Sequence, residues 1–155
     1  MDLISGPYWY AGPDFTTKHE IYPGTEFNPN GYSDNFASLV YDFNNDRWKD
    51  VLVIGYPGEA AHWFQNPKSP DAAWPSHVAL SIVDTESPTF GDLTGDGKPE
   101  LICAQNGQLG WAEPNVDTSL MWKFHPVTPK RDYEKYTHGL GFGDVNMDIL
   151  ERNAW

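Results

Sequence analysis

Short apolar runs separated by turn residues dominate this sequence, and long apolar stretches with helical spacing are absent. Some runs alternate between apolar and polar residues, and others are continuously apolar for four or five residues. Alternation is typical of a strand with one buried face, and a short continuous run is typical of a strand buried on both faces. The clearest expected strands lie at 35–43, 51–55, 77–83, 87–93, 101–104, 122–127, 138–145 and 149–151.

The apolar runs recur with a fixed period. An acidic residue followed by apolar residues opens four similar segments, at Asp2, Asp50, Glu100 and Asp148, so the spacings are 48, 50 and 48 residues. Each opening leads to a tryptophan, at Trp9, Trp63, Trp111 and Trp155. A period near 50 residues with about four strands in each unit is expected of the blades of a β-propeller.

We therefore expect an all-β chain that forms a partial β-propeller of about three four-stranded antiparallel blades, with about thirteen strands in total. The expected units are a partial blade at 1–36, a blade at 37–86, a blade at 87–137 and a partial blade at 138–155. Three blades cannot close a ring, so their end faces would expose apolar surface. We expect the sequence to be a piece of a longer protein, or its open blade faces to associate with each other.

Composition narrows the range of partners. The formal net charge is −12, which disfavours binding to the phosphates of nucleic acid. No run of 18 apolar residues occurs, so no membrane span is expected. The single cysteine, Cys103, lies in an apolar run and is expected to be a buried strand residue.

Two acidic loops share one spacing of oxygen-bearing residues. They read DFNNDRWKD from Asp42 to Asp50 and DLTGDGKPE from Asp92 to Glu100, with side-chain oxygens at positions 1, 3, 5 and 9. Calcium takes six to eight oxygen ligands in a flexible cage, and position 7 would add a backbone carbonyl. The expected ligands are Asp42, Asn44, Asp46, the carbonyl of Trp48, Asp50, Asp92, Thr94, Asp96, the carbonyl of Lys98 and Glu100.

An EF-hand loop is disfavoured because it needs a glutamate at position 12, where these loops have Val53 and Cys103. The alternative is a polar hairpin turn, since Asp, Asn and Gly are common in turns without any metal. Two loops with the same spacing, in register with the repeat, favour calcium over that alternative. Gly97 permits the sharp turn at position 6, and Arg47 must adopt the same turn at some cost.

These loops, the Phe90-Gly91 and Phe142-Gly143 pairs and the strand after each loop resemble the FG-GAP/VCBS-type repeat. That repeat is found in integrin-alpha-like propellers and in bacterial VCBS repeat-containing proteins. The resemblance implies calcium bound between the first two strands of a blade, and complete propellers of about seven blades. It also implies a secreted, cell-surface or periplasmic location.

A fourth loop departs from the family pattern. The chain reads DVNMD from Asp144 to Asp148, and about four residues of the pattern are missing. We expect this loop to be too short to encircle an ion, which leaves Asp144, Asn146 and Asp148 as lesser metal candidates.

The resemblance implies recognition of a carbohydrate or protein ligand. Aromatic residues usually fill the space between blades, but some can stack on sugars. The ligand-binding candidates are Tyr8, Trp9, Tyr10, Trp63 and His138. One alternative is a polysaccharide lyase or hydrolase that uses Tyr136 with His138, or Lys135, at the channel mouth. It is less favoured because paired carboxylates with glycosidase roles are not evident. The other alternative is a non-catalytic protein-interaction scaffold.

Overall fold

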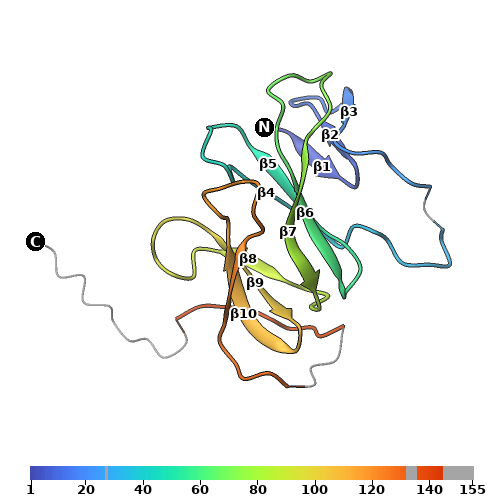
Figure 1. Cartoon of the computed structure of the whole chain (residues 1–155). Coiled ribbons are helices and arrows are strands. Elements are labelled where there is room, and N and C mark those ends of the chain that lie inside the picture. Colours follow the sequence, from blue (N-terminus) through green and yellow to red (C-terminus); the bar gives the residue numbers. More distant parts are fainter. Residues whose placement is uncertain (27, 132–135, 145–155) are drawn as a thin grey trace, which may run out of the picture.

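The computed structural model describes residues 1–26, 28–131 and 136–144, and its strands form three antiparallel sheets (Figure 1). No helix in this part of the chain is long and apolar enough to cross a lipid bilayer. The prediction of an all-β chain is confirmed, and successive antiparallel sheets are the arrangement of a partial propeller. The strands are β1 (Leu3–Ser5), β2 (Tyr8–Tyr10), β3 (Lys18–Glu20), β4 (Ala37–Tyr41), β5 (Asp50–Ile54), β6 (Glu59–Phe64), β7 (Ser76–Val83), β8 (Thr89–Gly91), β9 (Glu100–Gln105), β10 (Gln108–Glu113) and β11 (Lys123–Pro126).

Each sheet is a meander in which every strand pairs with the next one along the chain. The first sheet has the order β1-β2-β3, the second β4-β5-β6-β7 and the third β8-β9-β10-β11. The second and third sheets have matching registers, because Asp50 pairs with Tyr41 and Glu100 with Gly91 at the start of β5 and β9. These two sheets are therefore copies of one unit.

The apolar runs predicted to be buried on both faces are the second strands of these two sheets. In β5, Leu52 and Ile54 belong to a core cluster that also includes Leu101 and Cys103 of β9. Val51 and Val53 belong to a second cluster, together with Ile21. Because neighbouring residues of a strand point to opposite faces, β5 packs against the third sheet on one side and the first sheet on the other.

A stacked tryptophan–histidine pair recurs in all three sheets, across the last two strands. Trp9 stacks on His19 with ring centroids 4.2 Å apart, and the ring separations of the other two pairs are 4.4 and 3.9 Å. Those pairs are Trp63 with His77 and Trp111 with His125, and all three are also cross-strand register partners. Stacking of this kind fixes the outer strand on each sheet.

Eleven of about thirteen expected strands occur in the described residues. The strand expected at 138–145 is wrong for its described part, because 138–144 are irregular and the preceding Thr137 makes only a single bridge to Thr85. The Phe142 ring lies directly against Gly91, which leaves no room for a side chain there. The strand expected after Asp148, and Trp155, lie outside the described residues.

We predict that Leu101→Ala lowers the free energy of unfolding by about 2–5 kcal/mol, because it leaves a cavity between the second and third sheets. Leu101 is fully buried, whereas Leu120 is 53% exposed. The same truncation at Leu120 should cost less than about 1 kcal/mol. Urea unfolding followed by tryptophan fluorescence measures both, and equal losses would contradict this account of the core.

Candidate functional site

The two acidic loops connect the first and second strands of neighbouring sheets. The loop 42–50 joins β4 to β5, and the loop 92–100 joins β8 to β9. In both, the acid at position 1 follows the leading strand directly, and the acid at position 9 is the first residue of the next strand. The fold thus places two equivalent loops at the same edge of adjacent sheets.

In the loop 42–50, backbone N–H groups hold the carboxylates. Asp42 accepts hydrogen bonds from the amides of Asp46 at 2.9 Å and Arg47 at 2.7 Å. Asp46 Oδ1 accepts one from the amide of Trp48 at 2.9 Å. Arg47 has a φ of 74°, as the loop position requires, which costs a residue with a Cβ on the order of 1 kcal/mol. The conformation of this loop is therefore held by hydrogen bonds from its own amides to its own carboxylates.

The loop 92–100 repeats this scaffold. Asp92 accepts hydrogen bonds from the amides of Gly95 at 2.7 Å and Gly97 at 3.0 Å. Asp96 Oδ1 accepts one from the amide of Lys98 at 2.8 Å. Gly97 takes the same positive φ as Arg47 without the steric cost. The shared bonding shows that the common spacing of acids encodes a common loop conformation.

The ninth-position acids, Asp50 and Glu100, are buried, and each accepts hydrogen bonds from the backbone near the start of its own loop. Asp50 accepts hydrogen bonds from the amides of Phe43 and Asn66, both at 2.9 Å. Burial raises the pKa of Asp50 to about 6, although these two hydrogen bonds oppose the shift. Glu100 accepts hydrogen bonds from the Leu93 amide at 2.9 Å and the Thr94 hydroxyl at 3.1 Å.

Three acids of the loop 92–100 fit a metal ion. Each of Asp92, Asp96 and Glu100 offers a carboxylate oxygen, and these atoms lie within 4.8 Å of one another. Calcium–oxygen distances of 2.3–2.6 Å place two ligands of one ion up to about 5 Å apart. The oxygens are also the hard donors that calcium prefers. Thr94 donates its hydroxyl to Glu100, so in this conformation it supports an expected ligand.

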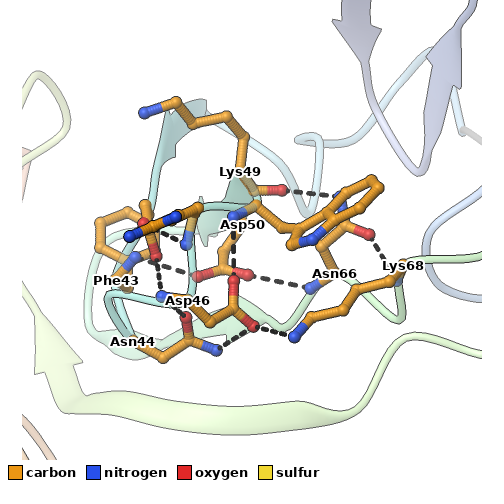
Figure 2. A network of polar contacts seen from close by, with 10 residues as sticks. Phe43, Asn44, Asp46, Lys49, Asp50, Asn66 and Lys68 are labelled. Carbon is orange, nitrogen blue, oxygen red and sulfur yellow. Dashed lines mark hydrogen bonds and ion pairs between the residues drawn. The ribbon is translucent and has the colours of Figure 1, made fainter.

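The loop 42–50 is arranged differently at its centre (Figure 2). The ammonium of Lys68 lies 3.0 Å from Asp46 Oδ2, and the side-chain amide of Asn44 donates to the same oxygen at 3.2 Å. Among the described residues, Asp42, Asp46 and Asp50 do not form a cluster comparable to that of the other loop. Lys68 belongs to the turn after β6, and its part in this loop was not predicted from the sequence.

The remaining metal candidates are not brought together by the described structure. Asp144 is described and exposed, whereas Asn146 and Asp148 lie outside the described residues. The carbonyls of Trp48 and Lys98 stay predicted ligands, since only their amides have assigned roles.

The aromatic candidates divide between surface and core. Tyr8, Trp9 and Tyr10 make up the half-buried strand β2. Trp9 also lines a cavity of about 730 Å³ together with Trp48 and Trp74. Trp63 is only 2% exposed, so a ligand could not reach its ring.

Of the residues considered for catalysis, His138 pairs with an acid and Tyr136 bonds to another tyrosine. His138 Nε2 lies 2.7 Å from Glu86 Oε2, and the hydroxyls of Tyr56 and Tyr136 are 2.6 Å apart. The bond to Tyr136 raises the pKa of Tyr56 to about 12, which makes this phenol a poor base near neutral pH. Lys135 lies outside the described residues.

We predict that Asp50 makes stability depend on pH in metal-free protein. Its folded pKa of about 6 exceeds its ordinary value of 3.8, so the folded state favours the protonated acid. This contribution is complete below pH 3.8 and is lost as the pH rises through 6; it amounts to at most about 3 kcal/mol. The unfolding free energy of wild type minus that of Asp50→Asn should fall from pH 4 to pH 7 in a chelating buffer. A constant difference would contradict the shift.

Comparison with known proteins bears on the same part of the chain. Residues 42–103 match the family model described as an FG-GAP-like repeat. The matched segment begins with the first acidic loop, includes the second and ends within β9. No curated protein and no solved structure gives a significant match. The match at residues 42–103 is consistent with the FG-GAP-like repeat that the acidic loops predicted.

Proposed function

We propose that this chain is part of a calcium-stabilised β-propeller module that recognises a carbohydrate or a protein outside the cell. The FG-GAP-like repeat and the all-β fold indicate a propeller-type interaction module. The observation that carries the calcium proposal is the cluster of Asp92, Asp96 and Glu100. The extracellular location rests on the repeat type, which is typical of extracellular proteins.

Calcium would act on the first hairpin of the third sheet. Asp92 follows β8 and Glu100 begins β9, so an ion held by both would connect the ends of two paired strands. Asp96 would close the site from the tip of the loop. The ion would also remove the repulsion among three neighbouring carboxylates, so that its binding free energy would contribute to folding. The role would be structural, because the ion would join the ends of two paired strands.

The cavity between the first and second sheets is the best-supported surface for a carbohydrate. Three tryptophans line it, and Trp48 is 47% exposed. Indole rings stack on the apolar faces of sugars. Together these features favour a saccharide over a flat protein epitope.

We predict that calcium raises the melting temperature of the wild-type protein. At a free concentration one hundred times Kd, binding contributes about 2.7 kcal/mol, which for a chain of this size corresponds to roughly 5–10 °C. Asp96→Asn should lose most of this rise because it removes one of three charges from the cluster. Asp71→Asn, an exposed acid outside both loops, is the matched control and should keep it. An unchanged melting temperature in wild type would refute the calcium proposal.

We predict that Trp48→Ala weakens saccharide binding at least tenfold, because it removes an exposed stacking surface from the cavity. A glycan array identifies the ligand, and isothermal titration with wild type and variant measures the loss. Trp48→Phe should retain part of the affinity. Turnover of a bound polysaccharide would instead favour the lyase or hydrolase alternative. Failure to bind any glycan, with capture of one defined protein, would favour the scaffold.

A further inference from the structure

Lys68 supplies a positive charge to the centre of the loop 42–50 from outside that loop. Its ammonium lies 3.0 Å from Asp46 Oδ2, and the Trp48 amide donates to Asp46 Oδ1. The side-chain amide of Asn44 also donates to Asp46 Oδ2. Both oxygens of the fifth-position acid are therefore engaged by groups of the protein itself.

Asn66 fixes the turn that presents Lys68 (Figure 2). Its backbone amide donates to buried Asp50 at 2.9 Å, and its side-chain amide donates to the carbonyl of Lys49 at 3.0 Å. Its side-chain oxygen accepts a hydrogen bond from the amide of Lys68 at 2.8 Å. These bonds tie the turn after β6 to Lys49 and Asp50 at the end of the acidic loop, and so they place the backbone of Lys68 close to Asp46.

The third sheet allows a comparison within the same molecule. Trp63 pairs with His77 and Trp111 pairs with His125, and both pairs are separated by fourteen residues, so the intervening segments align without gaps. The position of Asn66 is then occupied by Pro114, and that of Lys68 by Val116.

With Pro114 and Val116 at these positions, the third sheet lacks both the amide that binds the ninth-position acid and the ammonium that binds the fifth-position acid. Proline has no N–H to donate to the ninth-position acid. Val116 is fully exposed and carries no charge. The third sheet has no equivalent of the tethered ammonium at this position, although its acidic loop has the same backbone scaffold.

The loop 42–50 also has more basic residues near its acids than the loop 92–100 has. Three acids of the loop 42–50 have Arg47, Lys49 and Lys68 as near neighbours in sequence or space. The three acids of the loop 92–100 have only Lys98 within the loop. The oxygens of this second loop are also the ones that converge within 4.8 Å. Among the described residues, an ion pair reaches an acid of the loop 42–50, whereas the acids of the loop 92–100 form none.

We propose that Lys68 is a built-in counter-ion that closes the loop 42–50 without metal, so that the chain binds one calcium ion, in the loop 92–100, instead of two. The proposal rests on the proposed function in one respect, because it takes calcium to be the ion of the second loop. It narrows the metal ligands predicted from the sequence to those of that loop. The residue five positions after the repeat tryptophan then determines whether a repeat requires metal.

Calcium titration of chelator-treated protein by isothermal calorimetry tests this stoichiometry. Wild type should bind one ion, and Lys68→Met should bind two, because the loop 42–50 loses its internal cation. Val116→Lys should bind calcium at least tenfold more weakly than wild type, since it introduces an ammonium at the equivalent place. Lys123→Met removes an exposed lysine paired with Glu113 and should leave one site. Near-ultraviolet circular dichroism verifies that each variant is folded.

The outcomes separate this proposal from the calcium proposal on which it rests. Two ions in wild type would overturn the role of Lys68 and leave the calcium proposal intact. A single ion in Lys68→Met would also overturn it. No ion in wild type, with one gained in Lys68→Met, would uphold Lys68 as the counter-ion and refute calcium in the loop 92–100. Adding Asp46→Ala to Lys68→Met should remove the gained site, which assigns it to the loop 42–50.

Discussion

A buried carboxylate at the start of the second strand holds each repeat together. Asp50 and Glu100 are the first residues of β5 and β9, and both lie among the buried strands of the core. An ionised group in such a place is costly unless it is hydrogen-bonded. Each accepts hydrogen bonds from the first residues of its own loop. The loop therefore cannot change its path without leaving a buried acid unsatisfied, and the geometry of the acidic loops follows from this constraint.

The same constraint links the loops to the packing of the sheets. Asp50 lies next to Val51 and Leu52, which point to opposite faces of the second sheet and contact its two neighbours. A strand buried on both faces has no freedom to slide, because a shift by one residue would exchange the two sets of side chains. The position of the acid is thus fixed by the core, and the loop is fixed by the acid. This order explains why bonds to the first, fifth and ninth acids recur at the same loop positions in both copies.

Much of the fold could be predicted from the sequence because it depends on short-range patterns. Apolar runs identified β5 and β9, and the repeat of an acid before each run located the loops. The spacing of fourteen residues between Trp63 and His77, and between Trp111 and His125, could also have revealed the recurrent stack.

Other features depend on contacts that no local pattern records. Lys68 follows the loop 42–50 by eighteen residues and reaches Asp46 only because β6 returns along β5. Sequence alone shows a lysine in a turn. The strand expected at 138–145 had an alternating pattern, but its described residues lack a paired neighbouring strand. A strand requires a partner for its backbone hydrogen bonds, and the alternation of side chains cannot supply one.

The two acidic loops pose the same electrostatic problem, since each gathers three carboxylates at one edge of a sheet. A free cation solves it only where that cation is abundant, because the occupancy of the site follows the ratio of concentration to Kd. A lysine carried by the adjoining turn has a high effective concentration and is always present. If the loops divide as proposed, the second sheet keeps its hairpin under all conditions, and the third sheet becomes ordered with calcium. A chain built in this way would confine its calcium dependence to one blade, and the neighbouring blade would remain as a stable template for its packing.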